Sequence, residues 1–266
     1  MSFNTAIAVF LLIPFAVYAL FAGLVFFNNI RAGKRLVASA KPFAREGDFP
    51  VKVLVVGDSL AVGVGAYDLF TLPERFASML NASIENRAAS GAKMKDIEQQ
   101  ILSASSMKYD YILIVGGAND IIRMTPDGVL QDAIRASYGA AKIRSERVVA
   151  ITSGDVGIAP FFIFPFNLWY TKKTNETRPF FIDIAQELGV EYINLLIYED
   201  VFHTDVPRYY AEDLLHLSSD GYGVWFEHIK ERMQKVWNVI DQTPQQPKQN
   251  QVPAQGEVLQ QTQKAS

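Results

Sequence analysis

The sequence contains no cysteine. Disulfide bonds, zinc sites built from thiolates and cysteine nucleophiles are therefore excluded for this chain. Histidine is also scarce, with 3 residues in 266, so any chemistry that needs an imidazole has few candidates. The net charge of −3 is small and negative. It gives no reason to expect nucleic acid as a partner, because nucleic-acid binding needs concentrated positive charge.

Charged side chains are missing from the first thirty residues. The segment from Ala6 to Phe27 is almost wholly apolar and is longer than the roughly 20 residues that a helix needs to cross a bilayer core. A secretory signal peptide is the alternative, with a weak cleavage motif at residues 16–19. However, no basic residue precedes the apolar segment, and the segment is long for a signal. We therefore expect residues 1–30 to form a retained, single-pass membrane anchor.

Both flanks of the remaining chain have their own composition. Residues 31–49 carry five basic side chains before the first acidic one, namely Arg31, Lys34, Arg35, Lys41 and Arg45. They are expected to form a basic juxtamembrane linker, and this charge predicts a cytoplasmic orientation, with an exported or periplasmic domain as the alternative. Residues 243–266 are rich in glutamine and proline, so we expect a disordered tail.

Between these flanks, short apolar segments alternate with segments of helical spacing. The segment Val53–Val56 and the segment Tyr109–Val115 are typical of strands buried on both faces, because they do not alternate apolar and polar residues. The other expected strands are 82–88, 147–152 and 190–195, and the expected helices are 73–80, 95–103, 129–143, 178–188 and 219–240. In the last helix, the side chains expected to point inward are Trp225, Ile229, Met233, Val236 and Trp237.

This alternation predicts one α/β domain over residues 50–242. Strands separated by helices pair in parallel, so the expected architecture is a three-layer α/β/α sandwich around a five-stranded parallel sheet, of the flavodoxin-like type. A fold of this class hosts many unrelated functions. Function must therefore be argued from residues at the ends of the strands.

Small and polar residues follow the first three expected strands. The three segments are Gly57-Asp58-Ser59-Leu60, Ser90-Gly91 and Gly117-Ala118-Asn119-Asp120. In open α/β sheets, such strand ends line one crevice where ligands bind. A serine there, beside the N–H groups of a helix start, is placed to act as a nucleophile. Taken alone, Asp58 and Ser59 fit a helix cap equally well.

A serine nucleophile needs a base, and histidine is the side chain whose ordinary pKa lies closest to neutrality. His228 lies inside the last expected helix, where we expect a structural or surface residue. His203 has no motif around it. His216 lies in the loop before the last helix, and Asp213 precedes it by three residues, close enough to orient its ring. Taken alone this pair is weak evidence, because Asp213 or Ser218 also fits a helix cap.

The order of these motifs resembles the SGNH hydrolase superfamily, the GDSL-type esterases and lipases. That family has Gly-Asp-Ser-Leu after its first strand, an isolated glycine in the second block, Gly-x-Asn-Asp in the third and Asp-x-x-His near the C-terminus. This chain has the same order, with Gly57-Asp58-Ser59-Leu60, Gly91, Gly117-Ala118-Asn119-Asp120 and Asp213-Leu214-Leu215-His216. The resemblance covers about residues 51–235. It departs from the family at Leu214 and Leu217, where glycine and proline are common.

The resemblance implies a catalytic triad. Ser59 would be the nucleophile, and His216 would be the general base that later protonates the leaving group. Asp213 would hold the tautomer of His216 and stabilise its imidazolium.

The resemblance also implies an oxyanion hole. It would consist of the backbone N–H groups of Ser59 and Gly91 and the side-chain amide of Asn119. Asp58 and Asp120 would hold loops in place. Neither a metal ion nor an organic cofactor is implied.

Residues 154–170 form an aromatic segment with three possible roles. It follows the end of a strand, so it fits the wall of an apolar acyl pocket. Trp169, Tyr170 and the following lysines also fit contact with a membrane interface, and a core-packing loop is the third interpretation. The segment is too short and too rich in proline for a second membrane span.

Together these patterns predict a membrane-anchored serine hydrolase. We expect it to cleave carboxylic esters or thioesters through an acyl-serine intermediate, on a small acyl-ester or lipid substrate. A glycan or carbohydrate O-acetylesterase with the same triad is the alternative among enzymes. A crevice-binding protein whose serine is only a helix cap is the alternative outside catalysis.

Overall fold

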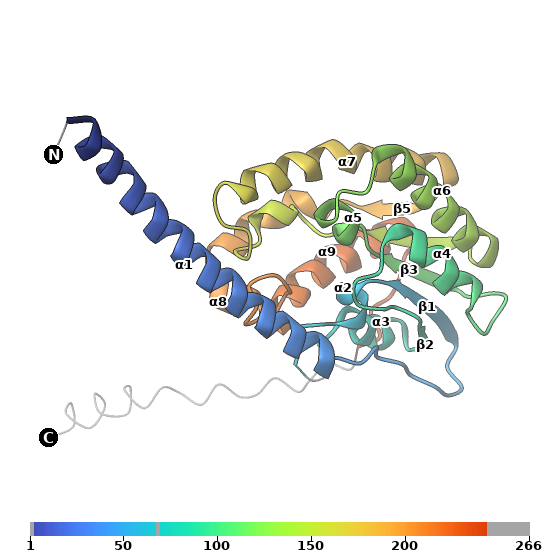
Figure 1. Cartoon of the computed structure of the whole chain (residues 1–266). Helices are drawn as coiled ribbons and strands as arrows, with labels where there is room; N and C mark the ends of the chain where they lie inside the picture. The colour runs from blue at the N-terminus through green and yellow to red at the C-terminus, as the bar shows by residue number, and fades with distance from the viewer. Residues whose placement is uncertain (1–2, 68–69, 244–266) are drawn as a thin grey trace, which may run out of the picture.

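Five parallel strands form the centre of the structure, a computed structural model that describes residues 3–67 and 70–243 (Figure 1). Their bounds are β1 (Val51–Gly57), β2 (Ala82–Asn86), β3 (Tyr111–Val115), β4 (Arg147–Ile151) and β5 (Glu191–Ile193). The spatial order is β2-β1-β3-β4-β5, so the chain changes direction between β1 and β3, where folds of this type bind ligands. The tail predicted for residues 243–266 lies outside the described residues from position 244 onward.

Helices cover both faces of the sheet, which confirms the three-layer sandwich. The long helices of the domain are α3 (Leu72–Leu80) and α9 (Ser219–Trp237) on one face, and α4 (Met94–Leu102), α6 (Asp127–Arg144) and α7 (Phe166–Leu188) on the other. Strand β1 shows how the sequence specifies these layers. Val53 and Val55 belong to the first core, whereas Leu54 and Val56 belong to the second, because successive side chains of a strand point to opposite faces.

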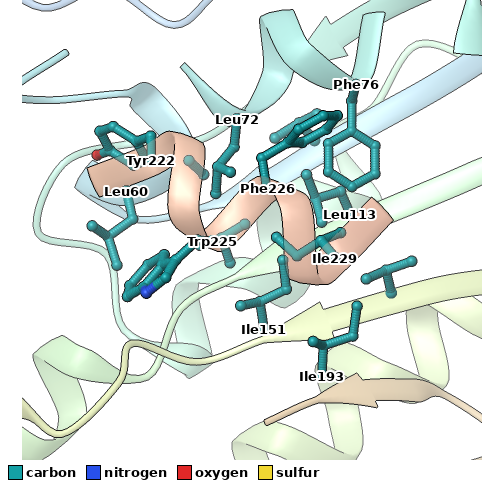
Figure 2. Close-up of a cluster of buried hydrophobic side chains, with 14 of the residues drawn as sticks. Leu60, Leu72, Phe76, Leu113, Ile151, Ile193, Tyr222, Trp225, Phe226 and Ile229 are labelled. Carbon is teal, nitrogen blue, oxygen red and sulfur yellow. The ribbon is translucent and has the colours of Figure 1, made fainter. Parts of the chain in front are cut away.

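Helix α9 packs the larger of the two cores against the sheet. Trp225 and Ile229 point from this helix toward the side of the strands that carries Ile151, whereas Phe226 points toward Phe76 of α3 (Figure 2), with 5.8 Å between the two ring centroids. The period of these residues is that of one apolar helix face. Burial of this face places the start of α9, and the loop before it, at the carboxyl edge of the sheet.

Short helices link the strands to the longer helices. They are α2 (Ser59–Val62), α5 (Ala118–Ile122), α8 (Val206–Tyr209) and the 3-10 helices η1 (Val156–Ile158) and η2 (Leu195–His203). Helix α2 begins where β1 ends, and α5 begins shortly after β3. The N-termini of both therefore open at the same edge of the sheet.

Helix α1 (Phe3–Ser39) is longer than the expected anchor (Figure 1). Its part Leu12–Ser39 is long and apolar enough to cross a membrane, a test that a signal sequence also passes. Residues 31–39, expected to belong to a linker, continue this helix. The C-terminal part of α1 packs on the domain, where Asn29 and Ala32 are buried. Residues 31–39 of the expected linker are therefore helical and belong to the folded structure.

Two expectations about helices need correction. Helix α7 begins at Phe166 and not at Arg178. The first part of α7 lacks the apolar spacing that predicts a helix, because its buried face is polar. Thr174, for example, is buried, and its hydroxyl donates to a backbone carbonyl of the same helix at 2.9 Å. Val236, expected to point inward, is 37% exposed, because the neighbouring Trp237 packs its ring against Tyr111 in this last turn of α9.

The end of β1 tolerates only glycine at position 57. Gly57 has a φ of +147°, and a Cβ there would lie 1.9 Å from the carbonyl oxygen of Val115. Gly57→Ala should lower the free energy of unfolding by about 2–5 kcal/mol through backbone strain and overpacking, as measured by chemical denaturation in mild detergent. Gly139→Ala in α6 is the control, because a Cβ there meets nothing within 4 Å. It should raise stability by about 0.5–1 kcal/mol; equal effects of the two variants would contradict the role of Gly57.

Candidate active site

Ser59 is the first residue of α2 and is separated from β1 only by Asp58. Asp58 caps this helix, because its Oδ1 accepts the N–H of Leu60 at 2.9 Å. The Ser59 hydroxyl makes a different contact, in which its Oγ lies 2.9 Å from Nε2 of His216. Asp58 therefore accounts for the cap, and the side chain of Ser59 points to the histidine.

His216 and Asp213 lie together behind this serine. Nδ1 of His216 is 2.6 Å from Oδ2 of Asp213, and Oδ1 of the same carboxylate accepts the backbone N–H of His216 at 3.0 Å. Burial by itself would raise the pKa of Asp213, but the hydrogen bonds and charge of His216 outweigh it and hold that pKa below its ordinary value. The structure thus brings Ser59, His216 and Asp213 into one chain of hydrogen bonds.

The turn between Asp213 and His216 explains the departure from the family's usual sequence. Leu214 has a φ of +59°, the left-handed conformation that glycine adopts without strain. An antiparallel bridge between Tyr210 and Leu217 closes this turn, and the N–H of Ala211 donates to His216 O at 2.8 Å. The loop therefore keeps the geometry that a glycine would favour, with leucine in its place.

The expected oxyanion donors line the same cavity as Ser59. The Ser59 N–H belongs to the first turn of α2, where backbone donors have no partner inside a helix, and Gly91 has a φ of +83°. Asn119 Nδ2 donates to Ala92 O at 3.1 Å and, over a longer 3.4 Å, to Asp58 Oδ2. The amide of Asn119 is thus held beside the cavity by one firm and one weak hydrogen bond.

Asp58 and Asp120 are both buried next to these donors. Burial raises the pKa of Asp58 to about 6, against the hydrogen bonds that lower it. The pKa of Asp120 is also raised by burial, while its Oδ2 accepts the N–H of Met94 at 2.8 Å and its Oδ1 accepts the Thr125 hydroxyl at 2.8 Å. Each carboxylate ties one loop at the sheet edge to its neighbour, which fits the expected supporting role.

A cavity of about 240 Å³ lies over Ser59. Besides Ser59, Gly91, Asn119 and His216, its walls are largely apolar and include Val37, Ile122, Ile158, Ala159, Leu215 and Trp225. Val37 belongs to no sequence motif of the site, because it lies in α1, far from the other site residues in the chain. Its participation depends on how α1 packs, which no local pattern reveals.

The aromatic segment divides between its three expected roles. Ile158 and Ala159 line the cavity over Ser59, whereas Phe162 packs against the main core. Phe164 and Trp169 are exposed, at 64% and 49%. One end of the segment therefore belongs to the site, and the other presents apolar side chains to the surroundings.

The other two histidines lie elsewhere. His203 is exposed and His228 is half-buried in α9, and neither lines the cavity over Ser59. Among residues 3–67 and 70–243, no group of three or more histidine, aspartate or glutamate side chains is placed to hold a metal ion. The hydroxyl of Ser59, the imidazole of His216 and the carboxylate of Asp213 are joined by hydrogen bonds, an arrangement suited to acyl transfer.

Comparison with known families agrees with this geometry. Residues 55–224 match the GDSL-like Lipase/Acylhydrolase family. The chain belongs to this family. As a GDSL-like hydrolase it is a carboxylic ester hydrolase in the general sense, and the matched region contains Ser59, Asp213 and His216. Helix α1 lies outside the matched region, so the family does not account for its contacts with the site.

Solved structures of this fold have low sequence identity to the GDSL-like chain. A protein from Lactobacillus plantarum has 15% identity and a TM-score of 0.60, covering 72% of this chain and 100% of that one. A catalytic mutant of the acetylxylan esterase Axe2 from Geobacillus stearothermophilus has 17% identity and a TM-score of 0.55, covering 70% and 94%. The esterase EstA from Pseudoalteromonas has 15% identity and a TM-score of 0.53, covering 70% and 98%. No curated protein sequence is significantly similar.

Proposed function

We propose that this protein is a membrane-anchored serine hydrolase that cleaves carboxylic esters or thioesters through an acyl-serine intermediate. The observation that carries the proposal is the contact of Ser59 Oγ with His216 Nε2 at 2.9 Å, with Asp213 at 2.6 Å from the other ring nitrogen. A serine that served only as a helix cap would not need this histidine. Asp58 already caps α2.

In the proposed reaction, Ser59 Oγ attacks the carbonyl carbon of the ester while its proton passes to His216 Nε2. Asp213 accepts the Nδ1–H of His216, which keeps Nε2 free to act as the base and stabilises the imidazolium. When the tetrahedral intermediate collapses, His216 gives the proton to the departing alcohol or thiol. A water molecule then attacks the acyl-serine by the same route in reverse and releases the acid.

The negative oxygen of the intermediate needs preorganised donors. We assign the backbone N–H groups of Ser59 and Gly91 and the Nδ2–H of Asn119 to this task. Asn119 donates one N–H to Asp58 at 3.4 Å and one to Ala92 O at 3.1 Å. The N–H in the longer, weaker bond to Asp58 is the one available to the oxyanion. Exchange of a weak hydrogen bond for one to an oxyanion favours the transition state over the resting enzyme.

An acyl-ester or lipid substrate fits the rest of the site. The cavity over Ser59 has largely apolar walls, and such walls favour hydrocarbon over sugar. The apolar part of α1 supports retention of the domain at a membrane, and the basic residues between Arg31 and Arg45 support a cytoplasmic orientation. The proposed domain thus faces the lipids from which such substrates come.

The test of the proposed function combines covalent labelling with a chain-length series. A fluorophosphonate probe should label the full-length protein at Ser59, since an activated serine forms a stable adduct with it. Rates on nitrophenyl esters from acetyl to dodecanoyl should rise with chain length, as each buried methylene adds about 0.8 kcal/mol of binding. A preference for acetyl would favour the O-acetylesterase alternative. Absence of both labelling and turnover in folded protein would favour a crevice-binding protein.

A further inference from the structure

A second groove, of about 370 Å³, runs between helix α1 and the loop that carries His216. Its walls include Ile30 and Val37 from α1, Phe161 from the aromatic segment and Leu215. Val37, Leu215 and His216 also line the cavity over Ser59. The groove and the cavity therefore meet at His216, within reach of the atoms that react.

The outer end of this groove reaches the apolar part of α1. The ring of Phe161 packs on that of Phe26, with 5.3 Å between their centroids, and the Tyr18 hydroxyl donates to Phe164 O at 2.5 Å. Around these contacts, exposed apolar side chains continue from α1 onto the aromatic segment; they include Phe21, Leu24, Phe27, Phe164, Phe166 and Trp169. A contiguous apolar surface of this kind marks contact with a membrane.

One polar group in the wall of the groove lacks a partner. Asn29 is 7% exposed, it lines the groove, and its Nδ2 donates to no atom of the described residues. Buried donors are normally hydrogen-bonded, so each exception calls for an explanation. An oxygen atom of a bound ligand would be the missing acceptor for this N–H group. A ligand that fits apolar walls and also carries such an oxygen is an amphiphile.

We propose that this groove binds the hydrocarbon chain of an amphiphilic membrane ester, which enters sideways from the bilayer along α1 and presents its carbonyl carbon to Ser59. An oxygen of its head region accepts the free N–H of Asn29. The inference rests on the proposed function, because it assumes that Ser59 attacks the ester. It goes beyond the family, since α1, which forms one wall, lies outside the matched residues 55–224.

Blocking the groove tests this inference in the full-length protein in phosphatidylcholine vesicles. Ile30→Trp and Ala38→Trp each introduce a large side chain at a residue of α1 that lines the groove, about two helical turns apart. Leu20→Trp is the matched control, because Leu20 is 66% exposed on the same helix and outside the groove. We compare kcat/KM for nitrophenyl acetate, nitrophenyl dodecanoate and dodecyl acetate, so that the long chain lies on the acyl side in one substrate and on the alcohol side in another.

The blocking variants should lower kcat/KM by about tenfold or more for nitrophenyl dodecanoate, for dodecyl acetate or for both. The value of kcat/KM for nitrophenyl acetate should change by less than about twofold. The affected substrate shows which half of the ester occupies the groove. Leu20→Trp should leave all three values unchanged. An equal loss on all substrates, or no loss with either blocking variant, would overturn the proposal.

A binding experiment keeps this test separate from that of the proposed function. A photoreactive long-chain fatty acid should label peptides that contain Ile30 and Phe161, and Ile30→Trp should suppress this labelling while Leu20→Trp does not. This result would support the groove even if the protein hydrolysed no ester. Labelling confined to the exposed part of α1 and equal in all variants would show membrane contact only and would refute the groove.

Discussion

Ser59→Ala should lower kcat by about 10⁴- to 10⁶-fold, since loss of a nucleophile from a triad removes the acyl-serine route and leaves only the contribution of the oxyanion donors. The Ser59 side chain contacts His216 at 2.9 Å and does not cap α2, which is capped by Asp58. The fold should therefore be unaffected. Initial rates on nitrophenyl butyrate measure the loss. Circular dichroism and the thermal midpoint verify that the variant is folded.

Ser90→Ala is the matched control for this prediction. Ser90 lines the same cavity as Ser59, and it is exposed at the edge of the sheet, without an assigned role in the reaction. Loss of its hydroxyl should change kcat by less than about tenfold. If Ser59→Ala kept the full rate, or if the two serine variants lost activity equally, the proposed nucleophile would be refuted.

The sheet was largely predictable from the sequence because its signal is local. Residues 53–56 of β1 and the whole of β3 are uninterrupted apolar segments, and this pattern results directly from burial on both faces. The first half of α7 was not predictable, because Thr174 and Thr177 are buried there and satisfy their hydroxyls within the helix. A helical segment with such buried polar residues has the same composition as a solvent-exposed loop. Only its packing in the folded protein distinguishes it from a loop.

The same distinction applies to the site. Ser59, Asp213 and His216 were identified from short motifs in a fixed order, and the structure places them in contact. Val37 and the rest of the α1 wall carry no motif. Their proximity to His216 arises from the docking of a helix that precedes the family's domain in the chain. The apolar composition of α1 predicts an anchor but gives no sign of these contacts with the domain.

Gly33 lies where α1 passes close to the triad. A Cβ at Gly33 would lie 3.0 Å from Oδ2 of Asp213, the oxygen that bonds Nδ1 of His216. This spacing is too short for an unstrained contact, so a larger side chain must displace either the carboxylate or the helix. Gly23, on the same helix, offers a comparison, because a Cβ there meets nothing within 4 Å.

Gly33→Val should therefore lower kcat by about 10²- to 10⁴-fold, the upper value being that of losing the triad acid and the lower that of a misplacement by about 1 Å. Gly23→Val should leave kcat unchanged, and neither variant removes a group that touches substrate. The loss should appear in kcat and in the rate of fluorophosphonate labelling, with KM for nitrophenyl acetate nearly constant, because the change acts on His216 through Asp213. A loss shared by both variants would indicate general disturbance of α1, and full activity of Gly33→Val would show that the helix yields without moving the carboxylate. The predicted difference between two glycines of one helix would make α1 a positioning element of the active site.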